Sequence, residues 1–298
     1  MNSNYKILFY LRTLKSISST FIDSFLVLYF IQLSSNNILP FGIYKIVCTT
    51  VIFLTIYLLK NISKSKNRVN LMRLGIIFDF IYFLTIILLR EKVVDYMYLV
   101  GIIYGLEEGF YYSIMNVYEA EGIKNKDRAK FSGNYYSVRS ILSIIFPLIF
   151  DSLIASQGFI RSILLISGLV TVRIILSFHY KDTKVPNSKI SLKKFANIIK
   201  ENKTLKQLLN TSFLNGFIYS SGAFGIIVTV YIIKVFNNSI SLGVFTSIFS
   251  LLTFIMGILF ANYIKKHQYV NLIKISIFII ILTLLAYNSI KLQRMIES

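Results

Sequence analysis

The sequence is poor in charged residues, which make up only 15% of its 298 positions, while 55% of the positions are hydrophobic. Soluble domains carry about 25% charged residues, so an ordinary soluble domain is excluded. Apolar runs of about 20 residues, the length that a membrane helix needs, occur repeatedly. Backbone groups in lipid must be hydrogen-bonded within their own segment. The sequence therefore predicts an all-α polytopic membrane protein.

Residues that build most catalytic and metal sites are scarce. Cys48 is the single cysteine and lies in an apolar run, which excludes a disulfide or cysteine metal site within one chain. His179 and His267 are the only histidines, and neither is near a carboxylate cluster with metal-ligand spacing. The phosphate-binding patterns G-x-x-x-x-G-K-[ST] and G-x-G-x-x-G are missing. No cofactor and no enzyme activity are expected, and a polytopic membrane enzyme is a less favoured alternative.

Acidic residues are also few, since 13 Asp and Glu stand against 32 Lys and Arg and give a net charge of +19. With a cytoplasmic N-terminus, basic residues in the inner segments outnumber those in the outer segments by about four to one. The excess positive charge is expected to meet anionic lipid and not nucleic acid. The first apolar run lacks a small-residue cleavage site, so no cleavable signal peptide is expected. These observations predict a multi-pass protein of the plasma membrane.

Nine membrane helices are predicted, with a break after the sixth. Their ranges are 9–33, 41–59, 73–90, 96–118, 131–155, 160–178, 207–234, 240–263 and 270–290. The break, residues 181–206, is rich in lysine and carries apolar residues at helical spacing, which predicts an amphipathic cytoplasmic linker. The expected organisation is a six-helix bundle at 1–180, this linker, and three helices of a partial second bundle at 207–298.

A basic stretch at 61–76, NISKSKNRVNLMRLGI, recurs at 262–277 as NYIKKHQYVNLIKISI. Six of the sixteen positions are identical, including Asn61 with Asn262, Asn70 with Asn271 and Lys64 with Lys265. The same offset of 201 residues pairs Gly42 with Gly243 in the preceding apolar segments. The register indicates two halves of about 200 residues that share one orientation in the membrane.

Six helices, a basic inner linker and a second half that repeats the first in the same orientation resemble the major facilitator superfamily of transporters. The family's loop pattern G-x-L-x-D-x-x-G-[RK]-[RK] is matched in part after helix 8 by Gly257, Leu259, Lys265 and Lys266, with Ala261 at the Asp position. In the first copy Leu58 and Lys64 fit, and Lys60 occupies the Asp position. Pro147 falls where drug–proton antiporters of the family carry G-P-x-x-G-G.

The resemblance implies a secondary active transporter that works by alternating access, with its substrate site near the midplane between the two halves. We expect a proton-coupled exporter of small or amphipathic solutes. Members have twelve helices in roughly four hundred residues, whereas nine are expected here. An inactive truncated remnant is therefore the alternative.

Ionisable groups within the bilayer are the candidates for function, because each costs about 2.5–3.5 kcal/mol at a helix centre. The apolar segments contain six such candidates: Asp23, Asp79, Glu107, Glu108, Arg139 and Arg173. Adjacent residues of a helix differ in direction by about 100°, so at most one of Glu107 and Glu108 faces a central cavity. Glu108 is preferred because Tyr112 and Asn116 continue its face. Glu107 then needs a partner elsewhere.

The family resemblance implies that helices 1, 2, 4 and 5 line the cavity, where Asp23, Glu108 and Arg139 would converge. The predicted pathway comprises Asp23, Glu107, Glu108, Tyr112, Asn116, Tyr136 and Arg139. In one hypothesis Glu108 takes up and releases a proton while Arg139 tunes it; in the other, a Glu–Arg pair only holds helices 4 and 5 together. Asp23 binds a cation or pairs with a basic side chain at the inner rim. Asp79 and Arg173 are interpreted as structural.

Overall fold

A computed structural model describes residues 3–35, 37–59, 67–123, 125–181, 192–218, 243–252 and 254–255. These residues are helical almost throughout and contain no strand, which confirms the all-α prediction. The helices are α1 (Ser3–Phe21), α2 (Val27–Leu33), α3 (Leu39–Leu58), α4 (Arg68–Leu89), α5 (Met97–Gly122), α6 (Asn125–Gln157), α7 (Phe159–Phe178), α8 (Leu192–Glu201) and α9 (Lys203–Ile218). All of them lie in one compact unit, Met1–Leu251.

The first membrane segment is one long helix with a π-helical turn, η1 (Ile22–Leu26), between α1 and α2. A π turn places one more residue in the turn than an α-helix does and commonly occurs at functional sites. Asp23 is the acidic residue of this turn. Pro40 lies in the first turn of α3, where its missing N–H has no helical partner to lose. A short 3₁₀ helix, η3 (Arg90–Val94), follows α4 directly.

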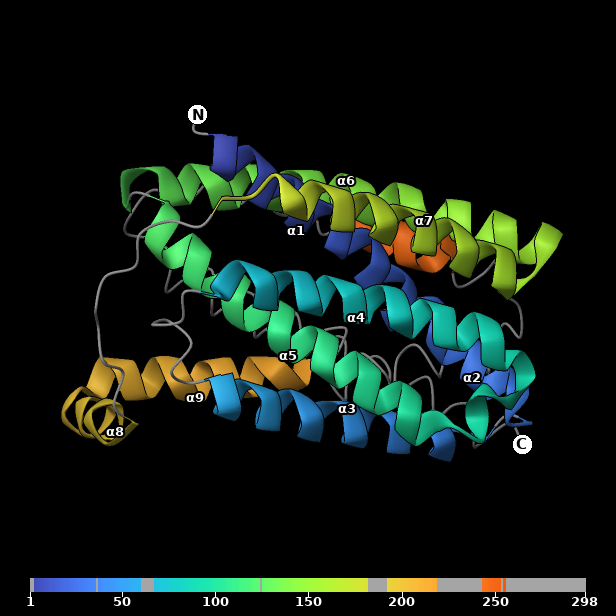
Figure 1. The fold of residues 1–298 in the computed structure, drawn as a ribbon, viewed down its shortest axis with the longest axis horizontal. Coiled ribbons are helices and arrows are strands. Elements are labelled where there is room, and N and C mark those ends of the chain that lie inside the picture. The colour runs from blue at the N-terminus through green and yellow to red at the C-terminus, as the bar shows by residue number, and fades with distance from the viewer. Residues whose placement is uncertain are drawn as a thin grey trace, which may run out of the picture. The chain divides into compact units, whose positions relative to one another are not determined.

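Five helices in the described part of the chain are long and apolar enough to cross a membrane. They are Asn4–Leu33, Leu39–Leu58, Arg68–Val94, Phe131–Gln157 and Phe159–Phe178. The prediction at 96–118 corresponds to α5, which has 26 residues but is less apolar because it carries Glu107, Glu108 and several tyrosines. In Figure 1 it crosses between α3 and α4, and it packs against both. The six helices predicted for the first half are therefore present, and α4 and α6 begin earlier than expected.

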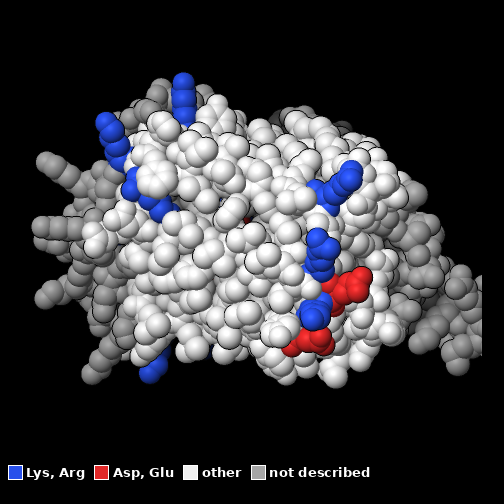
Figure 2. Space-filling view, turned by 45° about the vertical axis from the view of Figure 1, so that its right-hand side comes forward, with Lys and Arg blue, Asp and Glu red and all other residues white. Residues whose placement is uncertain are grey.

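The surface of the helices is largely uncharged. Figure 2 shows a broad uncharged belt that separates basic side chains at one end from a mixed acidic and basic group at the other. Exposed Phe53, Leu88 and Ile175 illustrate the apolar side chains of the surface, with exposed fractions of 68%, 73% and 56%. Such an apolar belt with charged ends matches the layering of a lipid bilayer.

Glycines bring α5 close to α3. Gly101, Gly105 and Gly109 recur every four residues and so share one face of α5. A Cβ atom added at Gly105 would lie 2.6 Å from Cβ of Val51 and 2.8 Å from the backbone oxygen of Cys48. Small residues at such positions allow membrane helices to approach closely. The close packing of α5 against α3 therefore depends on this stripe.

We expect Gly105→Ala to lower the stability of the bundle by about 1–3 kcal/mol, because the methyl group must push α5 from α3. Gly168→Ala in α7 is the matched control, since an added Cβ there meets nothing within 4 Å. Its effect should stay within about 1 kcal/mol and favour the helix. Thermal unfolding of the purified variants in nanodiscs measures both. Equal stability of the two variants would contradict the close-packing argument.

The basic stretch at 61–76 is described from Asn67 onward, and its arginines join the ends of three helices. Arg68 is fully buried and its Nη1 lies 2.7 Å from Oε2 of Glu121 at the end of α5. Arg73 donates to the backbone oxygens of Ser177 and Phe178 at the end of α7, at 3.3 and 3.4 Å. A guanidinium at a helix C-terminus satisfies orphan carbonyls and opposes the helix dipole. These bonds hold α4, α5 and α7 together at one end.

Part of the predicted second half lies outside the described residues. Within the linker, 192–201 forms α8 and 182–191 is not described. The helix predicted at 207–234 begins earlier, with α9 at Lys203, and is described up to Ile218. Of the helix predicted at 240–263, Gly243–Leu252 is described as helical. The predicted helix at 270–290 and the second copy of the basic stretch at 262–277 lie outside the described residues.

Candidate functional site

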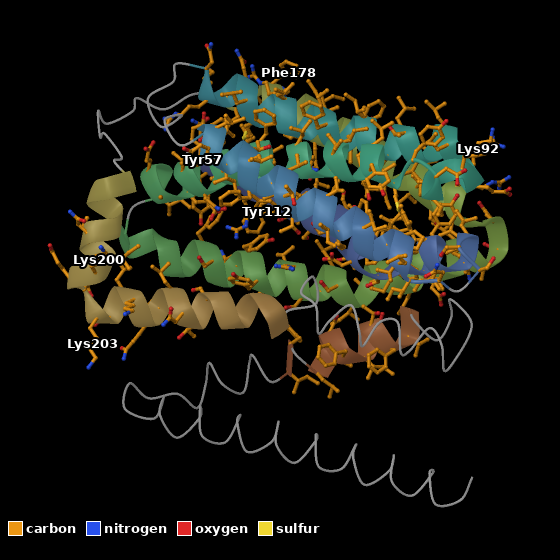
Figure 3. All side chains as sticks on the ribbon, turned by 90° about the horizontal axis from the view of Figure 1, so that it is seen from below. Tyr57, Lys92, Tyr112, Phe178, Lys200 and Lys203 are labelled. Atoms are coloured by element: carbon orange, nitrogen blue, oxygen red, sulfur yellow. The ribbon has the colours of Figure 1, made fainter. Side chains whose placement is uncertain are left out.

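A cavity of about 380 Å³ lies among the first long helix, α3, α5 and α6. Its lining residues are Ser16, Ser19, Asp23, Lys45, Cys48, Thr49, Ile52, Tyr104, Glu108, Tyr112, Tyr135 and Arg139. Figure 3 shows Tyr112 between Lys92 and Tyr57, which lie toward opposite ends of the bundle. The cavity is thus a polar and aromatic hollow at mid-depth in an otherwise apolar bundle.

A cluster of buried charges lies beside this cavity. Nζ of Lys15 in α1 is 2.6 Å from Oε2 of Glu107, 3.0 Å from Oε1 of Glu108 and 3.8 Å from Oδ1 of Asp79. Asp79 in α4 also accepts a hydrogen bond from Arg173 in α7. The side chains of Lys15, Asp79, Glu107 and Arg173 are at most 1% exposed. One connected cluster therefore joins α1, α4, α5 and α7.

The cluster contains one more carboxylate than cations, because Lys15 and Arg173 face Asp79, Glu107 and Glu108. A net buried charge is costly unless it is compensated. Glu108 is the member that reaches the cavity, with a side chain 16% exposed where Glu107 has 0%. Its Oε1 also accepts a hydrogen bond from the Tyr104 hydroxyl at 2.9 Å. A single proton from the cavity would neutralise the cluster.

The adjacent glutamates point in different directions. Glu108 lines the cavity, whereas Glu107 lies behind it against Lys15. Tyr112 also lines the cavity, one turn after Glu108. Asn116 does not, and instead lines a separate hollow of about 230 Å³ together with Glu119.

The tyrosine pair of α6 divides between the cavity and the surface. Tyr135 is buried and lines the cavity. The guanidinium carbon of Arg12 lies 4.2 Å from the centre of the Tyr135 ring. Tyr136 is 56% exposed and does not line the cavity. Of the predicted pathway residues, the structure thus brings Asp23, Glu108, Tyr112 and Arg139 to one cavity.

The remaining charges of the cavity come from η1, α3 and α6. Asp23 Oδ1 lies 3.7 Å from Nζ of Lys45 in α3. Arg139 lines the cavity but forms no ion pair within the described part of the chain. The cation beside Glu108 is Lys15. The alternative in which a Glu108–Arg139 pair holds two helices together is therefore not the arrangement seen.

Lys15 is the main residue of the cluster that is not among the six ionisable candidates from the sequence. α1 begins at Ser3, so Lys15 lies several turns inside the helix and not near its start. Leu11 and Ile22, four residues before and seven after it, are both fully buried. This helical spacing places Lys15 on the buried face and was a usable signal.

Comparisons with known proteins agree with this architecture. The profile of the Major Facilitator Superfamily matches residues 47–293. An uncharacterized protein of Bacillus subtilis strain 168, YqgE, is 24% identical over 255 residues, which cover 84% of this chain and 57% of that protein. An uncharacterized protein from the sodM 3′ region of Geobacillus stearothermophilus is 25% identical over 162 residues, or 53% of this chain and 73% of that protein.

The chain thus spans just over half the length of the B. subtilis relative. The family match covers well over half of the chain, and the helical membrane fold with a cavity among its first, second, fourth and fifth membrane helices agrees with it. The chain belongs to the major facilitator superfamily, a family of membrane transporters.

Proposed function

We propose that this chain contributes the proton-coupled half of a secondary active transporter, which exports small or amphipathic solutes by alternating access. The observation that carries the proposal is the position of Glu108. Its carboxylate lines a cavity at mid-depth and is bonded at 3.0 Å to Lys15 of a buried cluster. It is therefore the one carboxylate of that cluster in reach of both the cavity and the buried charges.

The charge of the cluster supports proton exchange at Glu108. With every member ionised, the cluster has one unmatched negative charge. A proton on Glu108 removes that charge and frees Lys15 to bind Glu107 and Asp79 alone. Because Lys15 lies on α1 and Glu107 on α5, the protonation state of Glu108 changes the forces between these helices. Coupling of this kind is what alternating access requires, since a bound proton must alter the relative stability of two arrangements.

The cavity lining supports the proposed class of solute, and the basic loops support the proposed orientation. Tyr104, Tyr112 and Tyr135 give the cavity aromatic walls with polar tips, which suit amphipathic solutes. The excess of basic residues in the inner segments favours a cytoplasmic N-terminus in the plasma membrane. In this orientation the cavity would exchange protons with the outside and release the solute there.

Glu108→Gln should abolish proton-driven flux while the folded yield stays at the wild-type level, because the amide keeps the shape but cannot ionise. Everted membrane vesicles with an acidic interior measure the uptake of ethidium, a cation, and anilinonaphthalene sulfonate, an anion. Glu91→Gln in η3 makes the same chemical change at an exposed position and should leave uptake unchanged. Gradient-driven uptake that survives Glu108→Gln, or that the wild-type chain does not show for either dye, would refute the proposal.

A further inference from the structure

Arg139 is the cavity cation that forms no ion pair with any residue that the structure describes. Lys45 lies 3.7 Å from Asp23, and Glu108 lies 3.0 Å from Lys15, so both cavity acids already face a cation. Asp23 interacts electrostatically with Arg139, but the ion pair that it forms is with Lys45. A guanidinium does not lose its proton in proteins, so this positive charge persists at any physiological pH.

Arg139 is an exposed residue that borders the cavity, so its charge is compensated in part by what the cavity contains. It lies in the middle of α6, in the segment Phe131–Gln157 that is apolar enough to cross a membrane. An arginine at such depth is costly unless water or an anion compensates it. Its planar fork of N–H groups fits carboxylate, sulfonate and phosphate oxygens through two parallel hydrogen bonds. The compensating partner in the working protein is therefore expected to be an oxyanion.

The rest of the cavity fits the body of a small planar molecule. Tyr135 lies one helical turn before Arg139 on the same face of α6, and Tyr104 and Tyr112 line the cavity from α5. Serine and threonine hydroxyls complete the polar part of the lining. A volume of about 380 Å³ is at the small end of ligand pockets. Oxyanion and aromatic contacts are thus available within one site.

Charge also disfavours a cationic ligand here. A cation in the cavity would lie near the unpaired guanidinium, while Asp23 and Glu108 are already occupied by lysines. An anion can bind the guanidinium of Arg139 without breaking the Lys45–Asp23 or the Lys15–Glu108 pair. We propose that the cavity binds a small organic anion, with its oxyanion on Arg139 and a planar apolar body against the tyrosines. This inference rests on the proposed function, because it names the class of solute for that cavity.

Binding to the purified full chain in nanodiscs tests the proposal without any ion gradient. The probes are benzenesulfonate, benzyltrimethylammonium and benzyl alcohol, which share a benzene ring and carry a permanent negative, positive or zero charge. Affinities are measured by saturation-transfer difference NMR. Benzenesulfonate should bind at least about tenfold more tightly than either other probe, in line with a charge-assisted bidentate contact.

Arg139→Gln should weaken benzenesulfonate binding by about 10- to 100-fold and leave benzyl alcohol binding unchanged. Arg139→Lys keeps the charge but loses the planar fork of N–H groups. Its affinity for benzenesulfonate should lie between those of the wild type and Arg139→Gln. Arg161→Gln is the matched control, because Arg161 is an exposed arginine in the first turn of α7. Melting temperatures of the variants show whether each remains folded.

The inference is overturned if benzenesulfonate fails to bind at tens of millimolar, if the cation binds as tightly, or if Arg139→Gln binds the sulfonate like wild type. These outcomes differ from a failure of the proposed function. If vesicles show no proton-driven flux, the proposed function fails, but selective binding of benzenesulfonate would still support the anion site. If the cation binds preferentially, the anion site is refuted, but proton-driven flux would still support the proposed function.

Discussion

Lys15→Met is expected to cause a severe loss of folded protein. Lys15 faces three carboxylates within 4 Å, and its side chain is 1% exposed. Removing one partner of a buried ion pair costs about 3–5 kcal/mol, because the remaining charge stays buried and uncompensated. Here the substitution would leave the carboxylates with Arg173 as the remaining cation of the cluster. Folded yield and thermal stability after purification measure the effect.

A second substitution separates charge from packing at this position. Lys15→Met combined with Glu107→Gln removes one charge of each sign from the 2.6 Å pair. We expect it to recover much of the stability lost in the single variant, since replacement of both partners of a buried pair by neutral groups is often tolerated. Lys6→Met, at an exposed position of the same helix, is the control and should have little effect. If Lys15→Met is as stable as Lys6→Met, the buried cluster does not hold the bundle together.

Arg173→Met should have the second large effect, again about 3–5 kcal/mol. Arg173 in α7 is fully buried, pairs with Asp79 in α4, and its guanidinium carbon lies 4.7 Å from the centre of the Tyr111 ring. The pair is the ionic contact by which α7 joins the cluster. Without Arg173, Asp79 retains only the longer contact to Lys15, at 3.8 Å. Loss of stability is measured by thermal unfolding, with Arg161→Met of the same helix as control.

The double variant Asp79→Asn with Arg173→Met tests whether this pair is structural. We expect it to be more stable than Arg173→Met alone and to retain proton-driven flux, because Glu108 and Lys15 remain in place. Recovered folding with lost flux would instead place Asp79 and Arg173 on the proton path. Failure of the double variant to recover stability would show that the shape of the arginine, and not its charge, matters for packing.

Under the proposed function, stability and proton exchange would be linked through Lys15. The same ammonium group compensates Glu107, which lies away from the cavity, and Glu108, which lines it. A proton that arrives at Glu108 therefore acts on a contact that also holds α1 to α5. Under the proposed function, a change of charge at Glu108 would thus reach the contacts between α1 and α5.

Sequence alone determined the helices and the fold class. Each membrane segment must satisfy its own backbone hydrogen bonds, so it forms a helix that is recognised by a long apolar run. It also separated Glu107 from Glu108, since neighbouring residues of one helix must diverge. The bounds of the segments differ by several residues from those predicted, since α1 begins at Ser3 and not at residue 9.

Only the tertiary structure decided which charges meet. The partners of Lys15 come from α4 and α5. The periodicity of one segment does not predict how neighbouring helices are rotated about their axes. For the same reason Tyr135 and not Tyr136 lines the cavity, and Asn116 lies at a different hollow. A helical pattern specifies which residues share a face, but the contact between two helices depends on packing of side chains from both.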